Sequence, residues 1–171
     1  MAHRFTIVGL GEALFDIVEG QERLGGAPLN VAVHAHQLSQ PSGGRGVVVS
    51  RIAQDELGKA LVRQLRDRGM TTQFIQYDPD RPTGQVFVDR DAQGQPTYDI
   101  VRGAAWDMLW FDSDLEDLAL TCNAVCFGSL AQREAQTRNA IYRFLETCRQ
   151  ATRLFDVNLR YPFYDARAIR R

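Results

Sequence analysis

The 171 residues include a single lysine, only three cysteines and no long apolar run. Lys59 lies in Gly58-Lys59-Ala60, which has neither the upstream glycine spacing nor the following Ser or Thr of a Walker phosphate-binding loop. Without a long apolar run we expect no signal peptide and no membrane contact, and the sparse, odd set of cysteines favours a cytoplasmic location.

Charge does not indicate a nucleic-acid partner. The 20 basic and 21 acidic residues leave a net charge of −1, and no long run carries one sign. A hydrophobic content of 44% is enough for one core of ordinary size. We therefore expect one globular segment rather than two autonomous domains.

The spacing of cysteine and histidine does not predict a metal site. Cys122 and Cys126 are four residues apart, but 123–127 is predicted to be a buried strand, which places both thiols on one face with no histidine near in sequence. His34 and His36 are two positions apart on a predicted helix, so they occupy different faces. We expect surface and packing roles for them, and no bound metal.

Strand and helix patterns alternate along the chain, as in an α/β sheet with crossover helices. The best-defined helix begins after Asp55, carries the apolar stripe Leu57, Leu61, Val62 and Leu65, and ends at Gly69. Other helices are predicted at 28–38, 115–120 and 132–150, and strands or extended chain at 5–10, 13–18, 47–49, 73–76, 124–127 and 153–157.

One block breaks this alternation. Two β-rich runs, 83–89 and 96–101, flank a polar, glycine-containing turn and are typical of a hairpin. A hairpin within an α/β order must lie outside the parallel sheet.

The segment Gly25-Gly26-Ala27-Pro28-Leu29-Asn30 has the features of a binding turn. Paired glycines let the backbone pass close to a ligand and adopt dihedral angles that other residues avoid. Pro28 suits the first helical position because its missing N–H would be unpaired there. Asn30 then places an amide in the first turn of the helix.

Asp16 is a charge within an apolar run. Burying a carboxylate is costly unless donors hydrogen-bond to it, and hydroxyls of a ligand are suitable donors; a solvent-facing strand residue is the alternative. Gly9-Leu10-Gly11 does not indicate a dinucleotide site, because Leu14 stands where a third glycine or alanine is needed and extended chain follows.

The segment Asp156-Val157-Asn158-Leu159-Arg160 follows a predicted strand, where open α/β sheets bind ligands. Arg160 could bind a phosphate or another ligand oxygen bidentately. Alternatively, Asp156 caps the next turn and pairs with Arg160 on the surface. Ser129, at another strand end, is a weaker candidate of the same kind.

These motifs together resemble those of the PfkB or ribokinase-like carbohydrate kinases, fructokinases above all. The shared features, in order, are Gly25-Gly26 with Asn30, the later Gly58, and the Asp-x-Asn-x-Arg segment 156–160. The resemblance covers essentially the whole chain. It implies a ribokinase-like α/β fold, with a mostly parallel sheet, crossover helices and a small β lid near 12–18 and 84–101 that excludes water from the sugar.

The resemblance also implies a small-molecule sugar substrate, phosphorylated from ATP with Mg²⁺. Asp16 would accept hydrogen bonds from two sugar hydroxyls, and Arg160 would also contact a phosphate. The residues implied to bind substrate are Asp16, Gly25, Gly26, Asn30, Asn158 and Arg160.

The second signature of this family is absent. The sequence contains no Gly-Ala-Gly-Asp, whose N–H groups hold the developing charge and whose aspartate takes the sugar proton, and no Asn-x-x-Glu, associated with magnesium. We therefore expect 1–171 to be the N-terminal, sugar-binding part of a kinase domain, without its nucleotide-binding part or catalytic base. The alternative is a truncated, inactive homologue that at most binds sugar. The sugar, and self-association through the lid or a sheet edge, remain open.

Overall fold

A computed structural model describes residues 5–90 and 92–164, and its central feature is a five-stranded sheet in the order β5-β4-β1-β8-β9. All neighbouring strands in this sheet pair in parallel. The alternating order expected from the sequence is confirmed. The strands are β1 (Phe5–Leu10), β4 (Gly44–Ala53), β5 (Ile75–Asp78), β8 (Ala124–Gly128) and β9 (Thr152–Asp156).

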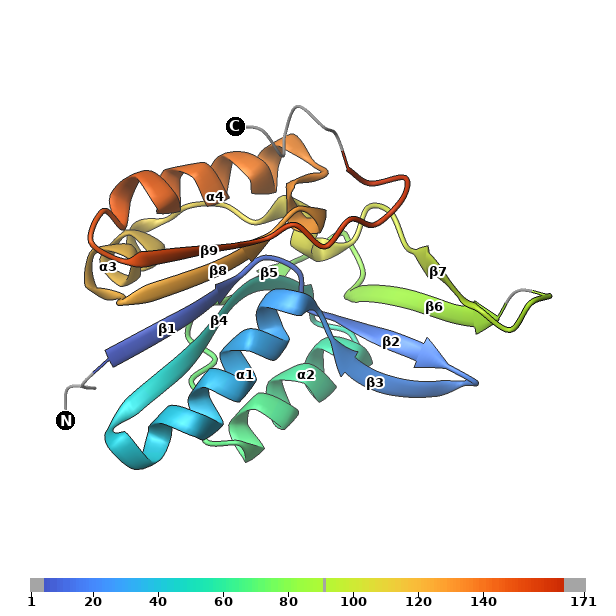
Figure 1. Ribbon diagram of the computed structural model, residues 1–171, viewed down its shortest axis with the longest axis horizontal. Helices are drawn as coiled ribbons and strands as arrows, with labels where there is room; N and C mark the ends of the chain where they lie inside the picture. Colours follow the sequence, from blue (N-terminus) through green and yellow to red (C-terminus); the bar gives the residue numbers. More distant parts are fainter. Residues whose placement is uncertain (1–4, 91, 165–171) are drawn as a thin grey trace.

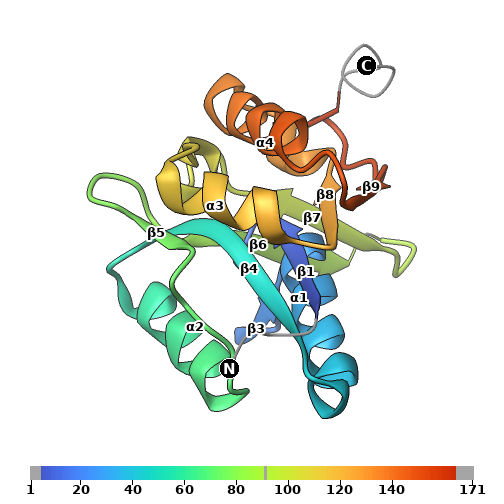
Figure 2. The same cartoon turned by 90° about the vertical axis from the view of Figure 1, so that its left-hand side faces the viewer.

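Helices cover both faces of the central sheet (Figures 1 and 2). One face carries α1 (Ala27–Ser39) and α2 (Glu56–Asp67), and the other carries α3 (Ser113–Thr121) and α4 (Ala135–Thr147). Two separate clusters of buried apolar residues result, one containing Ile52 and Leu61 and the other containing Val125 and Phe144. Strands covered on both faces read as continuous apolar runs, as Val47-Val48-Val49 does. Short 3-10 turns occur at η1 (Gln40–Ser42), η2 (Ala105–Met108) and η3 (Leu130–Gln132).

A second, four-stranded sheet projects from the central one in the order β3-β2-β6-β7 (Figure 1). The expected hairpin is confirmed, since β6 and β7 pair antiparallel outside the parallel sheet. β2 joins β6 in parallel, at the register Asp16 to Val86. The strands of this small sheet are β2 (Leu14–Val18), β3 (Gln21–Gly25), β6 (Gly84–Arg90) and β7 (Pro96–Ile100).

β3 is not predicted by the sequence pattern. Its first three residues are polar and exposed, so no apolar alternation marks it as a strand. The hairpin turn explains why it forms: Glu19 and Gly20 have φ of 52° and 77°, which matches the turn type that fits the twist of two paired strands. Gly25 therefore ends a strand instead of lying in a loop.

Three other predicted features need correction. The helix expected at 132–150 is shorter, because 130–132 forms a 3-10 turn and α4 ends at Thr147. The strand expected at 73–76 is Ile75–Asp78. Cys122 and Cys126 do not share a strand face, because Cys122 caps the end of α3 and lies near Cys148, whereas Cys126 lies in β8 near Asp156.

The helix with the strongest sequence pattern forms as expected. Asp55 accepts a hydrogen bond from the Gly58 N–H at 2.8 Å, and Gly69 follows the helix with φ 73°. Within the described ranges, no helix is both long and apolar enough to cross a membrane.

Candidate functional site

The predicted binding residues lie where the carboxyl ends of the central strands meet the small sheet. β1 leads through Gly11 and Glu12 into β2, and β3 leads through Gly26 into α1. The carboxyl ends of β8 and β9 lie at the same edge of the central sheet. This edge is where open α/β sheets place ligands.

Neighbouring atoms lie so close to residues 25 and 26 that only glycine fits at these positions. A Cβ on Gly25 would collide with the Asp16 carboxylate, and a Cβ on Gly26 would collide with the Glu12 carbonyl oxygen. Gly26 also has φ 110°, which L side chains rarely adopt. Pro28 is the second residue of α1 and not the first, but its missing N–H is tolerated there as well.

Asp16 lies on β2, one of the two middle strands of the small sheet, and is half-buried. Arg23 is paired opposite it on β3. Burial raises the pKa of its carboxyl, and the positive charge of Arg160 opposes that rise. The fold therefore brings Arg160 within electrostatic reach of Asp16, although the two residues lie near opposite ends of the sequence.

Arg160 also faces the small sheet. Its guanidinium carbon lies 4.9 Å from the ring centre of Tyr98 on β7. Tyr98 is not among the predicted site residues, because one tyrosine in a polar hairpin gives no pattern. The surface pair between Arg160 and Asp156, kept open above, is not found among the described ion pairs.

Asp156 and Ser129 shape the turn that carries Asn158. The Asn158 N–H donates to Asp156 Oδ1 at 3.1 Å, so the capping interpretation of Asp156 is confirmed. Ser129 Oγ donates to the carbonyl oxygens of Val157 and Asn158 at 3.1 and 3.2 Å. Ser129 thus holds this turn in place.

Asn30 is exposed on the first turn of α1. Its backbone N–H donates to the Gly26 carbonyl at 2.9 Å, so the glycine turn leads directly into the first turn of this helix. The fold thus gathers Asp16, the glycine turn and Arg160 directly, with Asn30 and Asn158 on the adjoining turns.

Glu12 was expected in a lid strand but precedes β2 in a buried loop, with only 2% of its surface exposed. Burial is the main cause that raises its pKa to about 7, and Asp156 adds to the rise. Hydrogen bonds from the backbone N–H groups of Ala27 and Glu12 itself, together with Arg133, favour its charged form.

The ion pair between Asp107 and Arg133 lies beside this loop and is almost fully buried. Arg133 Nη2 and Nε donate to the two carboxylate oxygens at 2.7 and 2.8 Å, and Nη2 also donates to the Val101 carbonyl. The guanidinium lies 4.0 Å from the Trp106 ring centre. Arg133, which follows η3, thereby connects the end of β7 to Asp107 in η2. Neither residue stands out in the sequence, because the pair is not local.

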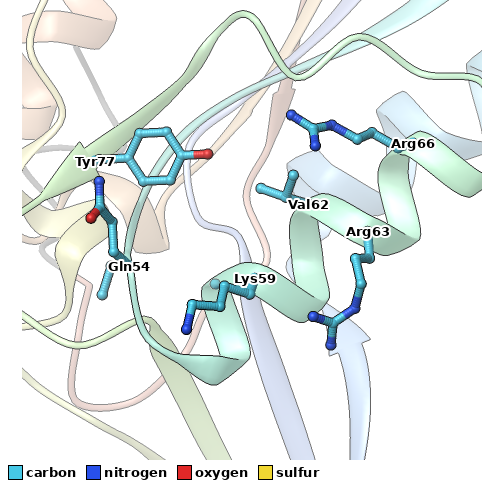
Figure 3. A pocket seen from close by; sticks show the side chains of 8 residues that line it. Gln54, Lys59, Val62, Arg63, Arg66 and Tyr77 are labelled. Carbon is cyan, nitrogen blue, oxygen red and sulfur yellow. The ribbon is translucent and has the colours of Figure 1, made fainter.

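A separate groove of about 590 Å³ lies between α2 and β5 (Figure 3). Lys59, Arg63 and Arg66 give it a basic lining, with Tyr77 on the other side. It contains none of the residues predicted to bind substrate.

The described residues do not form a metal centre. They contain no group of three or more histidine, cysteine, aspartate or glutamate side chains able to hold a metal ion. We therefore assign no metal ligand to them.

Residues 9–171 match the protein family described as pfkB family carbohydrate kinase. Among curated proteins, the chain is 29% identical to fructokinase from Solanum tuberosum over 95% of its own length and 54% of that protein. It is 30% identical to fructokinase-1 from Zea mays over 97% of its length and 55% of that protein. The chain thus spans about half the length of the curated relatives it matches.

Solved structures also match nearly all of this chain but only part of their own length. The fold matches fructokinase from Halothermothrix orenii with a TM-score of 0.82 at 22% identity, over 95% of this chain and 60% of that one. It matches fructokinase with bound ATP from Xylella fastidiosa with a TM-score of 0.79 at 25% identity, over 94% and 51% of the two chains.

Proposed function

Because the chain belongs to the pfkB family of carbohydrate kinases, we propose that it supplies the sugar-binding part of an ATP-dependent, fructokinase-like kinase that acts in the cytoplasm. The reaction is transfer of the γ-phosphoryl group of ATP to a sugar hydroxyl. Fructokinase relatives support a ketohexose substrate, and a related fructokinase with bound ATP supports the nucleotide.

The observation that carries the proposal is the meeting of Asp16, the Gly25-Gly26 turn and Arg160 at one end of the sheet. Asp16 accepts hydrogen bonds from two sugar hydroxyls, which repays the cost of its partial burial. The glycines let the sugar approach the backbone, and Asn30 and Asn158 add polar contacts from the adjoining turns. Arg160 binds a sugar oxygen or the phosphate that is transferred.

The small sheet acts as a lid in this proposal. It carries Asp16 on β2 and Tyr98 on β7, and Tyr98 contacts Arg160, which follows β9 of the central sheet. Closing this sheet over the sugar would exclude water, which otherwise competes as phosphoryl acceptor.

ATP and Mg²⁺ supply the phosphoryl group and neutralise its charge when bound. The residues of this chain bind and orient the sugar. The chain contains no Gly-Ala-Gly-Asp segment, so the proton of the sugar hydroxyl is accepted by a group that this sequence does not contain.

Calorimetric titration of the purified chain with fructose, together with a coupled assay for ATP turnover, tests the proposal. We expect fructose binding without turnover. Losing one oxyanion-type donor costs about 3 kcal/mol of transition-state stabilisation. This chain lacks the Gly-Ala-Gly-Asp segment, and with it both the N–H donors and the aspartate base. Failure to bind any hexose would contradict the sugar site, and turnover proportional to the chain would contradict the missing base.

A further inference from the structure

The Glu12 carboxyl lies between the start of α1 and the end of β8. The Ala27 N–H at the start of α1 hydrogen-bonds to it, and Glu12 Oε1 lies 4.0 Å from the point where a Cβ on Gly128, at the end of β8, would stand. The Glu12 carbonyl fills the space beside Gly26. Glu12 therefore supports the glycine turn from within the protein.

The charge of this carboxyl is poorly compensated. Glu12 Oε2 is buried and has no hydrogen-bond partner among the described residues. Arg133 is the cation that faces it, and its Nε and Nη2 donate to Asp107 and Val101, whereas its Nη1 donates to no group among the described residues. Asp156 of β9 repels it, and the Cys126 thiol of β8 is also within electrostatic reach. Together with burial, these surroundings hold the pKa of Glu12 at about 7.

Glu12 thus stands between the two halves of the sugar site. On one side it contacts the turn that leads to Asn30, through the Ala27 N–H. On the other it faces Asp156, which organises the turn that carries Asn158 and precedes Arg160. Two charged carboxylates repel each other, so a neutral Glu12 lowers the free-energy cost of holding the two turns close together.

We propose that Glu12 is a positioning residue that takes up a proton from solvent as sugar binds, so that affinity for sugar falls as the pH rises through neutrality. The inference rests on the proposed function. Sugar bound between the glycine turn and the Asn158 turn holds Asp156 toward the Glu12 carboxyl, and this like charge disfavours the charged form of Glu12.

Titration calorimetry with fructose between pH 5.5 and 8.5, in two buffers of different ionisation enthalpy, tests this role. For the unaltered chain we expect net proton uptake near neutral pH. If binding raises the pKa of Glu12 by one unit, the dissociation constant increases about tenfold across this range. Glu12→Gln, which is neutral at every pH, should bind as tightly at pH 8.5 as the unaltered chain does at pH 5.5.

Glu146→Gln, at an exposed position of α4, is the matched control and should keep the profile of the unaltered chain. Asp156→Asn tests the same role without altering Glu12, because removing the repelling charge should move the fall in affinity to lower pH. Fructose binding without proton uptake, a Glu12→Gln variant that keeps the pH dependence, or an unmoved Asp156→Asn profile would overturn this role alone. Absence of fructose binding at every pH would overturn the proposed function and this role with it.

Discussion

Asp16 and Asp89 both lie on strands of the small sheet, but only Asp16 is half-buried and faces Arg160. We expect Asp16→Ala to weaken fructose binding at least about tenfold, because each lost charge-assisted hydrogen bond is worth about 1.5 to 3 kcal/mol. Asp89→Ala, at an exposed position of β6, should leave affinity unchanged. Calorimetric titration compares the two variants, and equal affinities would show that Asp16 is not at the site.

Ion pairs in this chain differ sharply in burial. The side chains of Arg133 and Asp107 are 5% and 2% exposed, whereas those of Lys59 and Glu56 are 56% and 84% exposed. Arg133→Ala leaves a buried carboxylate uncompensated and should lower the free energy of unfolding by about 3 to 5 kcal/mol. Lys59→Ala breaks an exposed, solvent-screened pair and should lower it far less. Urea denaturation measures both, and similar losses would mean that the buried pair is replaceable by solvent.

At the scale of elements, Asp55 connects α2 to the start of β6. One carboxylate oxygen accepts from the Gly58 N–H and the Thr83 hydroxyl, and the other accepts from the Thr83 N–H. These hydrogen bonds hold the pKa of Asp55 below its usual range even though burial opposes them. A lowered pKa in the folded state means that this stabilisation is present above about pH 4 and is lost as the pH falls through the folded-state value.

We therefore expect Asp55→Asn to lower the melting temperature near pH 6 and to flatten its decline in acid. Loss of a helix cap typically costs about 0.5 to 2 kcal/mol, and the contacts to Thr83 add to it. Thermal melting followed by circular dichroism from pH 2.5 to 6 provides the measurement. Asp114→Asn, at an exposed position of α3, is the control. An Asp55→Asn profile parallel to that of the unaltered chain would exclude this linkage.

At the scale of the whole molecule, β9 is an exposed edge. Within residues 5–90 and 92–164 it pairs only with β8, and Leu154, Phe155 and Val157 are 48%, 37% and 43% exposed. Exposed apolar strand edges favour association. We expect the purified chain to self-associate with increasing concentration, and Leu154→Lys to reduce this. Light scattering over a range of concentrations tests the expectation, and a chain that stays monomeric throughout would contradict it.

The sequence by itself determined the α/β order, the hairpin outside the parallel sheet and the capped helix α2, because each depends on local periodicity or on neighbouring residues. The glycine turn and Asp16 could also be found, since paired glycines and a charge within an apolar run are local features.

Only the tertiary structure decided the remainder. β3 pairs with β2 without an apolar pattern. Arg160 contacts Tyr98 and acts electrostatically on Asp16, although all three are far apart in the sequence, and Arg133 binds Asp107 across separate elements. Glu12 shows the reason most directly. Glu12 is buried, and repelled by Asp156, because the ends of β1, β8 and β9 meet the start of α1 around it. Its raised pKa therefore depends on groups that the fold places around the carboxyl and not on its neighbours in the sequence.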